Sequence, residues 1–110
     1  MSRDTNLYLR DMVEACSRIA EYADGRDSAD IFGDRKRRDA ILWNLLVLGE
    51  AAKGVPADVR ARFPAIEWRK IAGFRDVLAH GYFGLDEDIV WDVIENKLPG
   101  LLTLLRDAAV

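Results

Sequence analysis

The sequence predicts an all-α protein, an antiparallel bundle of four or five helices, and three observations support this prediction. Apolar residues recur at intervals of three and four along four long segments, as they do on the buried face of a helix. We find no convincing stretch with the period of two that marks a strand. The connections between the four segments are short, and short connections make consecutive helices antiparallel neighbours.

The first segment is expected to form a helix from Leu7 to about Tyr22. Its apolar positions are Leu9, Met12, Val13, Cys16, Ile19 and Ala20, and charged residues lie between them. Gly25 follows, and it suits the left-handed conformation that often ends a helix.

A second helix is expected from Asp34 or Arg35 to Lys53, with Gly54 closing it. Its middle, residues 41–48, is apolar almost all round. One face of this helix should therefore contact something beyond the core of its own chain, or the helix should be central in the bundle.

Prolines, glycines and charged residues predict where the remaining helices begin and end. Residues 56–62 should form a short helix, because a leading proline fits the first turn. A longer helix is expected over residues 67–79, with Gly81 ending it. The last should begin near Asp86, since acidic side chains favour a helix N-terminus. Pro99 lacks a backbone N–H and should kink or break that helix.

Composition and length are those of one globular domain, residues 1–110, since half the residues are apolar and about a third are charged. Neither a signal peptide nor a membrane span is found, because the longest uninterrupted apolar stretch is residues 45–48. The single cysteine, Cys16, is interpreted as a small buried hydrophobe. We therefore expect a cytoplasmic protein without a membrane contact.

The net charge of −3 argues against a protein that coats nucleic acid by long-range attraction. The charge is unevenly distributed, however. Residues 35–75 hold ten basic and four acidic residues, whereas the segments before and after them are both acidic. The positive charge leads into residues 75–82, Arg-Asp-Val-Leu-Ala-His-Gly-Tyr, where the reactive side chains are concentrated.

These residue types disfavour a metal centre. His80 is the only histidine and Cys16 the only cysteine, so the chain lacks the four ligands of a zinc site. Asp76 and Glu67 alone would be a poor site for a hard cation. We expect no metal and no cofactor, unless a partner or a second copy of the chain donates ligands.

Helical geometry relates the reactive residues to one another. Asp76 lies one turn before His80 and can accept a hydrogen bond from its imidazole. Arg75 lies about 140° round the helix from His80. The two converge on one substrate only if the helix ends at His80, or if two chains bring their copies together.

Cleavage of RNA is the reaction that needs least beyond these groups, because RNA carries its own nucleophile, the 2′-hydroxyl. His80 can transfer a proton near neutral pH, and Arg75 can bind the phosphate and stabilise the charge of the transition state. On residue types alone, however, a lone histidine at a helix end is more often structural.

Several segments resemble, in order and spacing, the HepT-like branch of the HEPN superfamily. They are residues 8–11, 38–41, 48–53, 66–68, 71–83 and 90–91. The family's Arg-x4-His-x-Tyr signature is present as Arg75, His80 and Tyr82, with the usual polar residue after the arginine present as Asp76. The resemblance covers nearly the whole chain.

The resemblance implies a HEPN-like helical bundle that forms a homodimer, with two Arg/His motifs facing one cleft. It implies a metal-independent endoribonuclease toxin of a toxin–antitoxin pair, in which Arg75 and His80 are catalytic and Asp76 orients or tunes His80. The partner it implies is a minimal nucleotidyltransferase, MntA-like, which adenylylates Tyr82 and silences the toxin.

Each of these roles has a structural alternative. The basic run Arg35, Lys36, Arg37 and Arg38 could contact RNA phosphates or form a solvated helix start. Tyr82 could be a packing aromatic. Trp43, Trp68 and Trp91 are interpreted as core or interface residues rather than base-stacking platforms. Gly49–Glu50 is interpreted as a close helix contact beside a polar group near the cleft.

The leading hypothesis is therefore the ribonuclease toxin, with RNA as substrate. The alternative is a non-catalytic HEPN protein that acts as the regulatory half of a complex with the nucleotidyltransferase, or holds a nucleotide at Arg75 and His80. The leading hypothesis also predicts a homodimer that buries on the order of 1,200 Å² or more.

Overall fold

The computed structural model describes residues 4–81 and 84–109, and every regular element in that part of the chain is helical. The elements are α1 (Thr5–Ala23), α2 (Ser28–Phe32), α3 (Arg35–Gly54), α4 (Ala57–Arg62), α5 (Trp68–His80), α6 (Glu87–Asp92), the π-helical turn η2 (Val93–Lys97) and α7 (Leu98–Ala108). The all-α prediction is confirmed.

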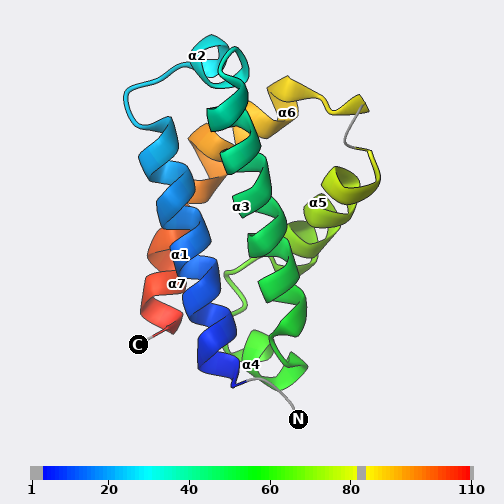
Figure 1. The fold of residues 1–110 in the computed structure, drawn as a ribbon. Helices are drawn as coiled ribbons and strands as arrows, with labels where there is room; N and C mark the ends of the chain where they lie inside the picture. Colours follow the sequence, from blue (N-terminus) through cyan, green and yellow to red (C-terminus); the bar gives the residue numbers. More distant parts are fainter. Residues whose placement is uncertain (1–3, 82–83, 110) are drawn as a thin grey trace.

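The long helices α1, α3, α5 and α7 form an up-down-up-down bundle (Figure 1). Helix α3 is central, because it packs against both α1 and α5, whereas α7 packs on α1. Helix α5 diverges from α3 toward its C-terminal end (Figure 1).

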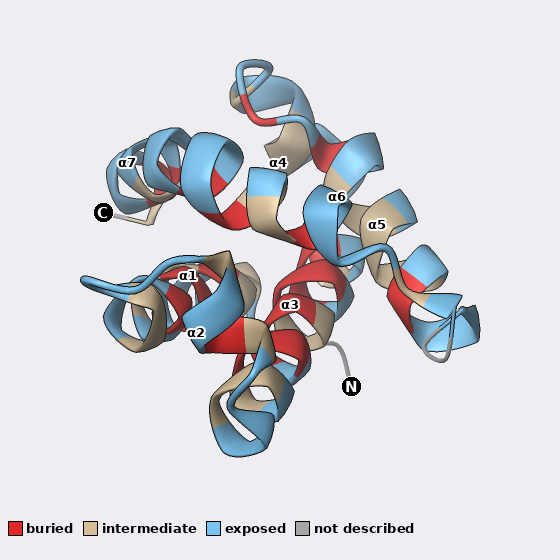
Figure 2. Ribbon diagram, turned by 90° about the horizontal axis from the view of Figure 1, so that it is seen from above, coloured by how far each residue is buried: buried red, intermediate tan, exposed pale blue. Residues whose placement is uncertain are grey.

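The core lies where the apolar stripes of α1, α3 and α7 meet, and Figure 2 shows their buried residues turned toward one another. Its fully buried side chains include Met12, Ile19, Ile41, Leu45 and Leu105. Cys16 is buried with them, and burial raises the pKa of its thiol to about 12. Cys16 is thus the buried hydrophobe expected from the sequence. In the described ranges, no helix is both long and apolar enough to cross a bilayer.

The helix boundaries follow local signals. Gly25 adopts a φ of +68° just after α1, as expected for the left-handed position. Helix α2 was not anticipated, because five residues are too few to show a period. Its signal is a capping box, in which the Asp27 and Asp30 side chains each accept a hydrogen bond from the other residue's backbone N–H.

Pro99 was expected to kink or break the last helix, and the structure instead shows a change of helix type just before it. The π-helical turn η2 precedes it, and Pro99 then lies in the first turn of α7. A proline in a first turn loses no intrahelical hydrogen bond. The chain thus stays helical from Glu87 to Ala108 and changes to π-helical hydrogen bonding before the proline.

The apolar middle of α3 divides into two faces. Ile41, Leu45 and Leu48 are buried, whereas Leu46 is only half-buried and Trp43 is 64% exposed. The helix is therefore central in the bundle and also keeps an apolar face outside the core.

Candidate functional site

The candidate site begins with a close contact between α3 and α5. A Cβ atom added at Gly49 would lie 2.1 Å from the Cβ of Arg75 and 3.3 Å from its Cα. Only glycine allows the two helices to approach this closely, which confirms the interpretation of Gly49 as a close helix contact. This contact fixes the base of the Arg75 side chain against α3.

Arg75 then extends between two carboxylates. Its Nε lies 3.2 Å from Oε2 of Glu50, on α3, and its Nη1 lies 3.3 Å from Oδ1 of the neighbouring Asp76. The Arg75 side chain is 28% exposed. The guanidinium is thus positioned from both sides but still reaches solvent.

Asp76 was expected to accept a hydrogen bond from the imidazole of His80, and it does so through its backbone carbonyl, whereas its carboxylate has other partners. The carboxylate faces Lys53 of α3, and the Lys53 ammonium is its hydrogen-bond donor. That hydrogen bond holds the pKa of Asp76 below its usual value. Two neighbouring cations, Lys53 and Arg75, therefore draw the carboxylate toward α3.

His80 bonds instead to the backbone of Asp76. Its Nδ1 lies 2.9 Å from the Asp76 carbonyl oxygen, in the last turn of α5. A carbonyl oxygen can only accept, so Nδ1 is the donor in this contact. When the imidazole is neutral, the proton sits on Nδ1, and Nε2 is the nitrogen that can take up another proton.

A groove runs beside Arg75. It has a volume of about 570 Å³, and its floor is the outer face of α3. Tyr8 and Asp11 of α1 form one wall, and Arg75 and Ala79 of α5 form the other. The α3 residues in the floor are Trp43, Leu46, Val47, Glu50, Ala51, Lys53 and Gly54.

The groove contains one of the two predicted catalytic residues. Arg75 lines the groove, whereas the exposed His80, at the end of α5, is not among the described residues that line it. Helix α5 ends at His80, with Gly81 as its C-cap, so the first of the two conditions for convergence set out from the sequence is met. The second condition, a second copy of the chain, stays a prediction.

The basic run lies elsewhere. Residues 35–38 begin α3, about 18–22 Å along the helix axis from Glu50 and about 8–12 Å from Trp43, and none of the four lines the groove. Arg37 donates to the carbonyl of Tyr22 at 2.6 Å, whereas Arg35 and Lys36 are exposed. The predicted RNA-contacting run is thus separate from the groove. The predicted modification site, Tyr82, lies outside the described residues.

Lys53 is the residue that the sequence interpretation missed. From the sequence, Lys53 had no role beyond its place in a segment that resembles the family. In the structure, its ammonium donates a hydrogen bond to the carboxylate of Asp76. The available signal was helical spacing, because Lys53 follows Gly49 by four residues and so shares the face that meets α5. Among the described residues, no three His, Cys, Asp or Glu side chains gather as a metal site would require.

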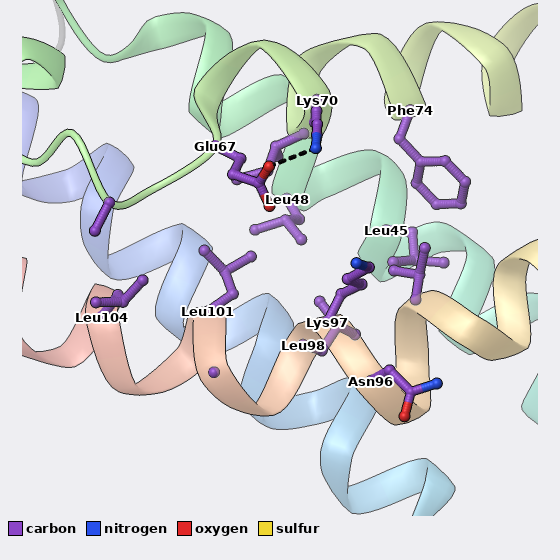
Figure 3. A pocket seen from close by; sticks show the side chains of 14 residues that line it. Leu45, Leu48, Glu67, Lys70, Phe74, Asn96, Lys97, Leu98, Leu101 and Leu104 are labelled. Atoms are coloured by element: carbon purple, nitrogen blue, oxygen red, sulfur yellow. Dashed lines mark ion pairs between the residues drawn. The ribbon is translucent and has the colours of Figure 1, made fainter.

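A second pocket, of about 420 Å³, lies on the other side of α5 (Figure 3). Leu45 and Leu48 of α3 lie between α5 on one side and Leu98 and Leu101 of α7 on the other. Its charged rim includes the ion pair of Lys70 with Glu67, 2.6 Å apart. Because it contains none of the residues 75–82, it does not belong to the candidate site.

Comparisons with known proteins agree with the geometry. The family described as ribonuclease HepT-like matches residues 12–108. A protein of Thermococcus cleftensis named a probable ribonuclease HepT is 36% identical over 101 residues, covering 92% of each chain. A provisionally named RNase of Methanocaldococcus jannaschii is 33% identical over 97 residues, covering 88% of this chain and 80% of that protein. No matching solved structure was found. The chain belongs to the HepT-like ribonuclease family of HEPN proteins.

Proposed function

We propose that this protein is a cytoplasmic, metal-independent endoribonuclease toxin that cleaves RNA in the cleft of a homodimer, with Arg75 and His80 as its catalytic residues. The observation that carries the proposal is the last turn of α5. There the Nδ1 of His80 is held by the Asp76 carbonyl, and Arg75 is held at the edge of an open groove. The family of the chain supports the ribonuclease part of the proposal.

The reaction follows from these groups. The 2′-hydroxyl of RNA loses its proton and attacks the adjacent phosphorus, and the bond to the 5′-oxygen of the next nucleotide breaks. Nε2 of one His80 accepts or returns the proton. The guanidinium of Arg75 stabilises the additional negative charge on the phosphoryl oxygens. Asp76 acts through other residues, since its carbonyl orients His80 and its carboxylate contacts Arg75.

The homodimer completes the site in this proposal. Val77 is an apolar residue that is 61% exposed, and it lies one turn before His80 on the outer side of α5. A contact between two copies across this side would bring the His80 residue of each copy to the other. The exposed Arg35 and Lys36 would then bind RNA phosphates further from the scissile bond, with Arg37 and Arg38 beside them.

The antitoxin in this proposal is a minimal nucleotidyltransferase that adenylylates Tyr82. The resemblance to HepT-like proteins supports this part, and Tyr82 stands two residues after His80 in the sequence. A bulky, negatively charged adduct so near His80 would obstruct the phosphate of the substrate.

Cleavage should survive EDTA, because the 2′-hydroxyl replaces a metal-bound water as the nucleophile. The products should end in a 2′,3′-cyclic phosphate or its hydrolysis product, as mass spectrometry of the fragments would show. An RNA with 2′-O-methyl groups throughout should resist cleavage and serves as the control. Loss of activity in EDTA that magnesium restores would contradict the proposed mechanism.

Tyr82→Phe should remain toxic when expressed but should escape the nucleotidyltransferase, because the substitution removes only the hydroxyl to which an adenylyl group can attach. The measurement is growth with and without the partner, together with the mass of the purified chain. Tyr22→Phe, which makes the same change in α1 outside the groove, is the control and should still be silenced. If the partner silences Tyr82→Phe as fully as the parent, Tyr82 is not the modified residue.

One observation favours the non-catalytic alternative. In the single chain, the charge of Arg75 is already balanced by Glu50 and Asp76. A protein that binds the nucleotidyltransferase but leaves cellular RNA intact when expressed alone would support this alternative. Expression of the chain alone, followed by analysis of RNA integrity, decides between the two.

A further inference from the structure

Trp43 lies outside the core. It is 64% exposed on α3, whereas Trp68 is buried and its Nε1 donates to the Phe63 carbonyl at 3.1 Å. Trp91 is half-buried. An exposed tryptophan ring leaves a large apolar area in water, and such rings are typical of binding surfaces. Of the two roles expected for Trp43, core or interface, the core role is therefore wrong, and the interface role is not tested.

The groove around Trp43 combines an aromatic ring with cations. Trp43 and Glu50 are seven residues apart on α3, so they share one face and lie about 10.5 Å apart along the axis. Arg75 and Lys53 line the same groove. Their carboxylate partners are themselves exposed, and exposed ion pairs contribute at most about 1 kcal/mol. A phosphate can therefore compete for either cation.

We infer that Trp43 is a nucleobase-stacking residue, which holds one unpaired base of the RNA while Arg75 engages a neighbouring phosphate. The inference rests on the proposed ribonuclease function and adds a substrate class, single-stranded RNA. A flat aromatic ring beside cations is the combination by which proteins bind single strands, because every base has a π-face and every nucleotide a phosphate.

The charges in the groove disfavour a protein helix as the occupant. Such a helix would cover Trp43 and Leu46, but it would also remove Glu50, Arg75 and Lys53 from water. Burial of an ion pair carries a desolvation cost that the attraction between its charges often does not repay. An RNA strand leaves the groove wet, and its phosphates complement Arg75 and Lys53.

Stacking on Trp43 requires an unpaired base. Within a duplex, both faces of each base are already stacked on its neighbours, so binding would require unstacking at a cost of a few kcal/mol. The protein should therefore bind a single strand more tightly than a duplex of the same sequence.

The test measures binding of a short, fully 2′-O-methylated, fluorescein-labelled oligoribonucleotide, as a single strand and as a duplex, by anisotropy. This probe keeps bases and phosphates but cannot be cleaved. Trp43→Ala should weaken single-strand binding about tenfold, since one base–aromatic stack contributes about 1–3 kcal/mol. Trp43→Phe should stay within about threefold of the parent, because it keeps a ring for stacking. The control is Ile89→Ala, an exposed apolar residue on α6 outside the groove, which should not change binding.

Two results would overturn the inference about Trp43 and leave the proposed ribonuclease function intact. One is unchanged single-strand binding by Trp43→Ala in a protein that still binds and cleaves RNA. The other is a Trp43→Ala variant that becomes monomeric by light scattering, which would make Trp43 an interface residue. A parent that binds neither form of the probe and leaves RNA intact would instead remove the proposed function, and the inference with it.

Discussion

His80→Ala and Arg75→Ala are each expected to lower RNA cleavage by about a hundredfold or more while the protein stays folded. The first removes the group that transfers the proton, and the second removes the charge that the transition state gains. His80 is exposed at the end of α5, so its loss leaves no cavity in the core. Circular dichroism checks the fold, and initial rates on a labelled RNA measure the effect.

Arg75→Lys separates charge from geometry. Lysine keeps one positive charge but cannot span the two carboxylates of Glu50 and Asp76 as the planar guanidinium does. We expect Arg75→Lys to recover only a small part of the lost rate. A fully toxic His80→Ala variant would move the assignment to the non-catalytic alternative.

Mixing the two inactive variants tests whether the site is shared between chains. If each site takes Arg75 from one copy and His80 from the other, a mixed dimer has one site with both residues intact. Because half of randomly assorted dimers are mixed and each has two sites, about a quarter of the parent activity should return. No recovery, in protein shown by light scattering to be dimeric and to exchange subunits, would mean that each chain supplies its own pair.

The long helices were predictable because their signals are local or periodic. The spacing of apolar residues gave α1 and α3, and Gly54 and Gly81 marked the ends of α3 and α5 within one residue. Helix α2 was missed because five residues are too few to show a helical period of apolar residues. Its capping box is the only signal in the sequence. A disturbance at Pro99 was predicted, but its form, a π-helical turn in a chain that stays helical, depends on packing that the sequence alone does not show.

The site was predicted less completely, because its details depend on contacts between helices. The sequence indicated which residues matter, and Gly49 was rightly interpreted as a close contact. It could not show that Lys53, 23 residues from Asp76, would hold that carboxylate and leave His80 to a backbone carbonyl. Helical spacing alone cannot decide between a nearby carboxylate and a nearby carbonyl, because both lie within reach of the imidazole.

Gly49→Ala and Gly73→Ala make the same chemical change on facing helices, and they should have opposite effects on stability. At Gly49 the new Cβ would lie 2.1 Å from the Cβ of Arg75. That atom belongs to the base of the side chain and cannot rotate away, so α3 and α5 must separate. Overpacking of this kind costs about 1–3 kcal/mol in the free energy of unfolding. It should also move Arg75 away from Glu50 and so lower cleavage.

At Gly73, inside α5, the new Cβ would have no described neighbour within 4 Å. The same methyl group should there stabilise the protein by about 0.5–1 kcal/mol, because alanine loses less backbone freedom in a helix than glycine. Urea denaturation of both variants measures the difference directly. Since helix propensity favours alanine at both positions, a loss at Gly49 alone can come only from the contact with Arg75. Equal stabilisation of the two variants would show that α3 and α5 do not touch there, and that Arg75 is not held by this contact.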